Sequence, residues 1–366
     1  MVLHILISNH NIPDAKKSFS PKKKLLVLIT FLFILLILLI NYFNKSKGER
    51  WTVVEQTSLA MGTAVKIKIA VQDENENIAK ANEVIKEAFS KIQYLESIAS
   101  SYKKDSLVSK INQQAGISAV KVTDDFLGII KEAQSISALT NGAFDITFAP
   151  LLKIWKLSEQ EPRIPSDEEI KSTLKFVDYH KIEINSDKKT VFLKGKGMEI
   201  GLGAIAKGSA VDWAIEIIKK MGYNNALVDA GGDIYALGFK NPSSKNKWQV
   251  GIQHPRKKGG LLGIVEIKDN AIVTSGDYEK KIIINGKQYH HIFDPRTGRC
   301  ADKSISVTVI ASTCQLADAL ATGIFVLGPE EGLKCIDKLP DVKCLIISPQ
   351  GHIYTSKNFP AGNFKF

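Results

Sequence analysis

The chain has 366 residues, of which 44% are hydrophobic and 24% are charged, as in an ordinary globular protein with one large or two modest domains. The formal net charge is +11, but the first 50 residues hold eight Lys and Arg against Asp14 and Glu49, which leaves only +5 on the remainder. A nucleic-acid-binding protein is therefore not indicated.

The first predicted element is an apolar run at 25–43, which has no charged residue and is close to the length that spans a bilayer as a helix. Lysines precede the run, so we expect a basic cytoplasmic segment at 1–24, a transmembrane anchor at 25–43, a linker at 44–50 and a domain at 51–366 on the outer side. No small-x-small cleavage site follows, so a retained anchor is favoured over a signal peptide. No cysteine lies nearby, which excludes lipid attachment through an N-terminal cysteine.

A hairpin and two helices are predicted next. Alternating apolar and lysine residues at 65–69 indicate a half-buried strand, and an amphipathic helix is expected at about 79–98. A second helix begins after Asp124-Asp125 and stops at Asn141-Gly142. Asp145 follows this helix among apolar residues, where a turn or capping role is the commoner one.

A glycine-rich stretch at 199–211 leads into another helix. Gly203 and Gly208 would let the backbone approach a ligand closely, and the free N–H groups of the helix start would suit a phosphate. Lys207 adds a positive charge. The stretch fits neither of the common nucleotide-binding glycine motifs, so by itself it is weak evidence for a nucleotide.

Strands dominate the second half of the chain. They are expected at 226–230, through 236–238, and at 248–253, 262–267 and 271–275, and Asn285-Gly286 predicts a hairpin between 281–284 and 287–292. A strand at 306–310, a helix, a short helix near 330–338 and two last strands complete the pattern. Strands in runs with grouped helices indicate an α+β fold with antiparallel sheets, in one compact two-lobed unit.

The helix after 310 carries two oxygen-bearing side chains on one face. Asp318 and Thr322 lie four residues apart among apolar neighbours, and a buried carboxylate needs a partner. Mg²⁺ held by the carboxylate and the hydroxyl would meet that need, although a solvent-facing or loop-bonded Asp318 is the simpler reading. Likewise His291 could be a structural strand histidine, and Asp294 an ordinary turn residue.

The four cysteines, Cys300, Cys314, Cys335 and Cys344, include no C-x-x-C pair. Zinc and thioredoxin-like chemistry are therefore not expected, while one disulfide remains open.

Seven motifs, in this order, resemble the ApbE family of FAD:protein FMN transferases, once described as thiamine biosynthesis lipoproteins. They are MGT (61–63), GAFDIT (142–147), LGAIAKGSAVD (202–212), LVDAGGDIYALG (227–238), TSGDY (274–278), HIFDPRTG (291–298) and ADALATG (317–323). The resemblance covers essentially everything after residue 50. It implies a T-fold-related arrangement of antiparallel sheets and packed helices, and a Mg²⁺-dependent enzyme that moves FMN from FAD onto a threonine hydroxyl of a partner protein and releases AMP.

The resemblance also implies roles for residues at matching positions. Asp318 and Thr322 would be side-chain metal ligands, with the carbonyl of Ala204 as a third. His291 is the candidate base for the incoming hydroxyl, since imidazole titrates near neutral pH. The residues implied to contact FAD are Met61, Tyr102, Ala143, Phe144, Asp145, Gly201, Lys207 and Ile292.

Two positions depart from the family pattern. The family usually has Asp where this chain has Gly201, and losing that acceptor would cost about 1.5–3 kcal/mol of FAD binding if it were charged. We hypothesise that Glu199, two residues earlier, substitutes in part; unchanged FAD affinity in Glu199→Ala would exclude this. Ala321 stands where some members have a further acidic metal ligand.

Three functions are compatible with these motifs: the flavin transferase, an FAD diphosphatase that uses water in place of threonine, and a non-catalytic flavin-binding protein in which Gly201 marks a decayed site. The family serves Rnf and sodium-pumping NADH:quinone reductase complexes, so the resemblance implies a subunit of such a complex as acceptor. It places the catalytic domain outside the cytoplasmic membrane.

Overall fold

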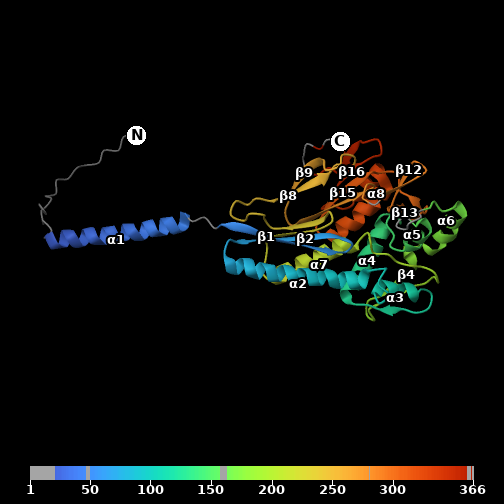
Figure 1. Ribbon diagram of the computed structural model, residues 1–366, viewed down its shortest axis with the longest axis horizontal. Helices are drawn as coiled ribbons and strands as arrows, with labels where there is room; N and C mark the ends of the chain where they lie inside the picture. Colours follow the sequence, from blue (N-terminus) through green and yellow to red (C-terminus); the bar gives the residue numbers. More distant parts are fainter. Residues whose placement is uncertain (1–20, 47–49, 157–162, 280, 361–363, 365–366) are drawn as a thin grey trace, which may run out of the picture. The chain divides into compact units, whose positions relative to one another are not determined.

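A computed structural model of the chain describes residues 21–46, 50–156, 163–279, 281–360 and 364. The chain divides into two compact units, Met1–Arg50 and Trp51–Phe366 (Figure 1). Of the predicted N-terminal regions, residues 1–20 of the basic segment and residues 47–49 of the linker lie outside the described residues.

The first unit contains one helix, α1 (Pro21–Ser46), within its described part. Its described apolar side chains are exposed, and the side chains at 38–46 lie outside the described residues. Among the residues that the structure describes, no helix is both long enough and apolar enough to cross a membrane.

The second unit is built on an eight-stranded sheet in the order β1-β2-β6-β7-β10-β15-β16-β17, in which all neighbours are antiparallel. The predicted alternation holds at β2, where Val65 and Ile67 are fully buried while Lys66 and Lys68 reach Glu55 on β1. The strands are β1 (Trp51–Ala60), β2 (Thr63–Gln72), β6 (Ala226–Ala230), β7 (Asp233–Leu237), β10 (Asn270–Gly276), β15 (Ser306–Ala311), β16 (Lys343–Ile347) and β17 (Ile353–Thr355).

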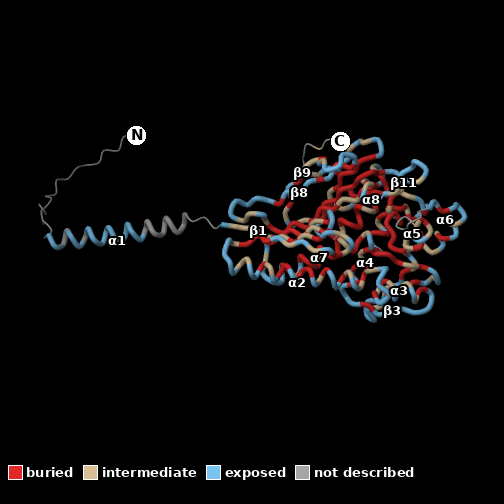
Figure 2. Tube along the Cα trace, in the orientation of Figure 1, coloured by how far each residue is buried: buried red, intermediate tan, exposed pale blue. Residues whose placement is uncertain are grey.

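Helices cover one face of this sheet, and α2, α7 and α8 pack directly on its strands (Figure 1). The apolar stripes of these helices meet the inward residues of the strands in the largest core (Figure 2). α4 lies against α8. The four helices are α2 (Asn75–Ala99), α4 (Asp124–Leu139), α7 (Ala206–Lys220) and α8 (Cys314–Ile336).

A hairpin of β8 (Trp248–Gln253) and β9 (Leu261–Ile267) covers the opposite face and encloses a second core (Figure 1). Because side chains alternate along a strand, Ile272 on β10 belongs to this second core while Val273 belongs to the first. The two cores share the sheet, so residues 51–366 form one unit.

The remaining elements include a three-stranded sheet, β3-β5-β4, and the two-stranded sheets β11-β12 and β13-β14. The remaining elements are α3 (Leu107–Gln113), β3 (Val120–Lys121), α5 (Ala149–Trp155), α6 (Asp167–Thr173), the 3₁₀ turns Leu174–Phe176 and Tyr179–Lys181, β4 (Ile182–Asn185), β5 (Thr190–Leu193), β11 (Lys281–Ile284), β12 (Lys287–His290), β13 (Phe293–Asp294) and β14 (Arg299–Cys300).

The antiparallel α+β architecture is confirmed, and strands 226–230 and 248–253 have the predicted bounds. The strand predicted at 287–292 is wrong at its end, because β12 stops at His290. The ring Nδ1 of His290 accepts the N–H of Ile292 at 3.3 Å, which takes that amide out of strand pairing. The short helix predicted near 330 is the second segment of α8, after a break at Gly328, whose φ is 80°, and before Pro329.

Candidate active site

Three buried or half-buried charges meet between α7, β7 and α8, and we call Lys207, Asp233 and Asp318 the charged cluster. The Nζ of Lys207 lies 2.7 Å from Oδ1 of Asp233 and 4.0 Å from Oδ1 of Asp318. The Lys207 side chain is 29% exposed, whereas those of Asp233 and Asp318 are 1% and 4% exposed. The Lys207 side chain is thus partly exposed, and its ammonium lies beside two buried carboxylates.

Burial and charge act in opposite directions on this cluster. Burial by itself would lower the pKa of the Lys207 ammonium, but the carboxylates of Asp233 and Asp318 outweigh burial and raise that pKa above its ordinary value. Burial and the neighbouring Asp318 raise the pKa of Asp233, whereas the Lys207 ammonium, 2.7 Å away, lowers it and favours the carboxylate. Oδ2 of Asp233 is buried and has no hydrogen-bond partner among the described residues.

The two predicted metal ligands on α8 face the start of α7 and the end of β10. Oδ2 of Asp318 accepts the N–H of Gly208 at 3.1 Å, so this carboxylate is bonded to a neighbouring segment. The hydroxyl of Thr322 lies 3.4 Å from that of Ser275 on β10. Among the described residues, no hydrogen bond reaches the carbonyl oxygen of Ala204. A carboxylate, a hydroxyl and a carbonyl are the oxygen donors that Mg²⁺ prefers, so this donor set fits the ion.

Gly208 lies at a close contact between two helices. A Cβ at this position would lie 2.3 Å from the carbonyl oxygen of Cys314, so the missing side chain allows α7 to approach α8. The glycine therefore serves helix packing, and its predicted approach to a ligand stays a prediction. Gly203 does face open space, with no atom within 4 Å of a Cβ built there.

The predicted flavin-contacting segment at 143–145 packs against α8 beside Thr322. A Cβ on Gly323 would lie 3.2 Å from the Cβ of Phe144. Asp145 is buried, and its carboxylate accepts the backbone N–H groups of Thr147 at 2.8 Å and Tyr179 at 3.0 Å. In the structure Asp145 thus ties this segment to the loop at 178–179, which is the structural role that the sequence left open.

Met61 and Tyr102 lie near the C-terminal end of α2. Met61 occupies the β1–β2 turn with a φ of 54°, and its N–H donates to Glu96 at 3.1 Å. Lys103 pairs with the same Glu96 at 3.9 Å, which brings the segment after α2 close to this turn. The Tyr102 side chain is 91% exposed. No described contact joins either residue to the charged cluster.

The two adjacent histidines occupy different environments. His290 is buried, its Nε2 lies 2.9 Å from the carbonyl of Ala301, and burial lowers the pKa of its imidazole. His291 is half-buried at the break between β12 and β13, and Ile292 beside it is buried in the main core. Asp294 accepts two hydrogen bonds from the Arg296 guanidinium at 2.8 Å, as expected for a residue that shapes the turn.

Gly201 and Glu199, the residue suggested to replace the Asp that the family usually has at position 201, both lie near α5. A Cβ on Gly201 would lie 3.4 Å from the Cβ of Ala149. The carboxylate of Glu199 is hydrogen-bonded to Lys153 of α5. Glu199 is therefore already paired with a cation in this structure.

Two residues of importance here were not predicted as site residues. Asp233, which holds Lys207, appeared only inside a motif. Asp212 accepts the N–H groups of Cys314 and Gln315, each at 2.8 Å, and so caps the helix that carries Asp318. The local signal for Asp233 was an acidic residue directly after a strand and a Gly-Gly turn. No pattern around Asp212 indicated that it caps the start of α8, 102 residues away.

The described residues contain no group of three or more His, Cys, Asp and Glu that could hold a metal ion. All four cysteines are free thiols, so the disulfide left open by the sequence is absent from the structure.

Comparison with known proteins finds relatives over most of the chain. The model of the ApbE family matches residues 61–346. An FAD:protein FMN transferase of Treponema pallidum is 31% identical over 326 residues, covering 85% of this chain and 89% of the relative. One of Vibrio cholerae is 33% identical over 279 residues, covering 75% and 81%.

Solved structures give the same result. The crystal structure of an ApbE protein from Thermotoga maritima has a TM-score of 0.77 and 33% identity, covering 84% of this chain and 98% of that one. The flavin transferase ApbE from Vibrio cholerae has a TM-score of 0.74 and 29% identity, covering 85% and 99%. Because the family model matches residues 61–346 and relatives of 31% and 33% identity cover most of the chain, this chain belongs to the ApbE family.

Proposed function

We propose that this chain is an FAD:protein FMN transferase, which uses Mg²⁺ to move FMN from FAD onto a threonine hydroxyl of an acceptor protein and releases AMP. The observation that carries the proposal is the charged cluster beside the oxygen donors of Asp318, Thr322 and Ala204. A diphosphate brings negative charge, and this place offers an ammonium, the start of α7 and a set of cation ligands.

The reaction exchanges one phosphorus–oxygen bond for another. The acceptor hydroxyl oxygen bonds to the phosphorus on the FMN side of the diphosphate, and the bond from that phosphorus to the bridging oxygen breaks, so that AMP leaves. His291 takes the proton of the hydroxyl as the bond forms. Mg²⁺ bound by Asp318, Thr322 and Ala204 would neutralise charge on the diphosphate oxygens.

Lys207 orients the diphosphate in this proposal. Its ammonium stays protonated because Asp233 and Asp318 raise its pKa, and its exposed fraction leaves it open to a ligand. Met61, Tyr102, Ala143, Phe144, Asp145, Gly201 and Ile292 remain the proposed flavin and adenine contacts. For Asp145 this contact would add to the hydrogen bonds already described.

We further propose that residues 25–43 attach the protein to the cytoplasmic membrane, with residues 51–366 on the outer side. Support comes from the uncharged apolar run and the lysines before it. The acceptor would then be a subunit exposed on that side, such as one of an Rnf or sodium-pumping NADH:quinone reductase complex.

The test uses the full-length protein with FAD, Mg²⁺ and the flavin-accepting domain of such a subunit, and follows acceptor mass together with AMP. We expect a mass gain equal to FMN with stoichiometric AMP, lost on adding a chelator and in Asp318→Ala. AMP and free FMN without acceptor labelling would instead identify an FAD diphosphatase. FAD binding without turnover would identify a binding protein.

A further inference from the structure

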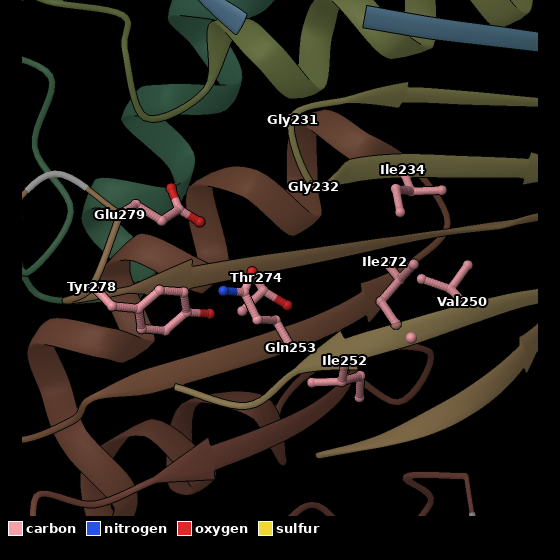
Figure 3. A pocket seen from close by; sticks show the side chains of 11 residues that line it. Gly231, Gly232, Ile234, Val250, Ile252, Gln253, Ile272, Thr274, Tyr278 and Glu279 are labelled. Atoms are coloured by element: carbon pink, nitrogen blue, oxygen red, sulfur yellow. The ribbon is translucent and has the colours of Figure 1, made fainter. Parts of the chain in front are cut away.

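A second site lies on the opposite face of the sheet from the charged cluster. It is a cavity of about 180 Å³ between β8, β7, β10 and the β6–β7 turn (Figure 3). The figure shows four aliphatic side chains gathered at one end and Thr274, Tyr278 and Glu279 at the other. The aliphatic residues are Ile234, Val250, Ile252 and Ile272.

The cavity and the charged cluster share two strands. On β7, Asp233 points to Lys207 while the next residue, Ile234, lines the cavity. On β10, Ser275 contacts Thr322 while the preceding Thr274 lines the cavity. Because neighbouring Cα atoms are about 3.8 Å apart, the two sites are separated only by the thickness of the sheet.

The end of the sheet leaves a path between the two sites. The turn that joins β6 to β7 consists of Gly231 and Gly232, and both are exposed and line the cavity. No atom lies within 4 Å of a Cβ built on Gly232, so the space at this residue is open. A Cβ on Gly231 would instead lie 2.3 Å from the hydroxyl of Thr63, so a polypeptide could cross from the cavity to the charged cluster over Gly232, with the Thr63 side chain beside it.

The edge of β8 faces the cavity. Four consecutive residues, 250–253, line it, and since side chains alternate, such a run means that the strand edge is presented. The register with β9 also shifts between Ile252 and Gln253, an irregularity that can re-aim a side chain. β8 pairs with β9 alone within the described part of the chain, which leaves its other edge available for hydrogen bonds.

The volume of the cavity limits the size of the group that it can bind. It is smaller than the roughly 300–1,000 Å³ of sites that enclose whole cofactors. A dry cavity of about 150 Å³ takes up benzene, so this one suits a single aliphatic or aromatic side chain. A free strand edge beside such a pocket is the arrangement that binds an extended peptide.

We propose that the free edge of β8 and this cavity bind the acceptor polypeptide. A segment of the acceptor pairs with β8, an apolar side chain near its threonine enters the cavity, and the chain crosses the Gly231–Gly232 turn to bring the hydroxyl to the charged cluster. The inference rests on the proposed function and specifies how the protein substrate of that reaction is recognised.

The test blocks the cavity without touching the charged cluster. Gln253→Trp places a large ring at the mouth of the cavity, and Gln249→Trp is its control, an exposed glutamine on the same strand that does not line the cavity. Ile234→Phe fills the cavity from the side of β7. Its control is Ile353→Phe, another half-buried isoleucine packed against the same core but on β17.

The full-length variants are assayed with FAD, Mg²⁺ and the flavin-accepting domain of an Rnf-type subunit, varying acceptor and FAD separately. We expect Gln253→Trp to lower kcat/KM for the acceptor by about tenfold or more, with Ile234→Phe acting in the same direction and both controls near wild type. The Kd for FAD, measured by flavin fluorescence, is expected to be unchanged. Hydrogen exchange at 248–253 should slow when acceptor is added, while exchange at 353–355 should not.

Other results would overturn the inference. Normal acceptor kinetics in both Gln253→Trp and Ile234→Phe would mean that the acceptor binds elsewhere. A parallel loss of FAD affinity would assign the cavity to the flavin site. Wild-type protein that releases AMP but labels no acceptor would refute the proposed transferase itself, and this inference with it.

Discussion

Replacing Asp233 by Asn tests whether the charged cluster is held by a buried ion pair. The Lys207 ammonium lies 2.7 Å from Asp233 and 4.0 Å from Asp318, and the Asp233 side chain is only 1% exposed. Asparagine keeps the shape of the side chain but removes its charge. The ammonium would then retain only the more distant carboxylate.

The magnitude follows from the burial of the two partners. Removing one partner of a fully buried ion pair costs about 3–5 kcal/mol, whereas an exposed pair is worth at most about 1 kcal/mol. Since the Lys207 side chain is 29% exposed, we expect an interaction between the two of about 2 kcal/mol. Asp233→Asn also removes the cost of burying a carboxylate, so a double-mutant cycle with Lys207→Met is needed to isolate the interaction.

The assay is urea unfolding of the full-length protein at neutral pH without FAD, followed by tryptophan fluorescence. We expect each single variant to lower the free energy of unfolding and the double variant to recover part of the loss. The exposed pair Glu76 and Lys80, at 2.6 Å, provides a reference cycle, and its coupling is expected to be smaller because water screens both charges. A coupling between Lys207 and Asp233 no larger than this reference would refute the ion-pair reasoning.

Three further results are expected. Burial raises the pKa of Asp212 to about 6, above its ordinary 3.8, so the stability that this carboxyl contributes is present below pH 4 and is lost as pH rises through 6. In chemical unfolding, the stability of wild type relative to Asp212→Asn should therefore fall by about 3 kcal/mol between pH 4 and 7. A difference that does not change with pH would contradict this. Gly208→Ala should lower the free energy of unfolding by about 1–3 kcal/mol, because its Cβ would press on the Cys314 carbonyl, whereas Gly203→Ala in open space should change it little; equal effects would exclude the helix-packing role. Asp318→Ala should weaken Mg²⁺ binding measured by calorimetry, and unchanged binding would remove Asp318 from the ligand set.

Local patterns were enough to predict much of the fold. Strands 226–230 and 248–253 were predicted with the bounds that the structure has, because alternation and flanking turns are encoded in adjacent residues. The failure at 287–292 also has a local cause, since the His290 ring takes an amide that a strand would use. Side-chain competition for backbone groups is not visible in the hydrophobic pattern.

The ordered motifs by themselves identified the family and named Lys207 and Asp318 as site residues. Only the tertiary structure decided that Asp233, 26 residues after Lys207, is its ion-pair partner, and that Asp212 caps a helix 102 residues away. It also placed Ile234 and Thr274 around a cavity on the reverse of the sheet. These contacts depend on how helices and strands pack in space, and residues distant along the chain carry no periodic signal of which neighbour they will meet.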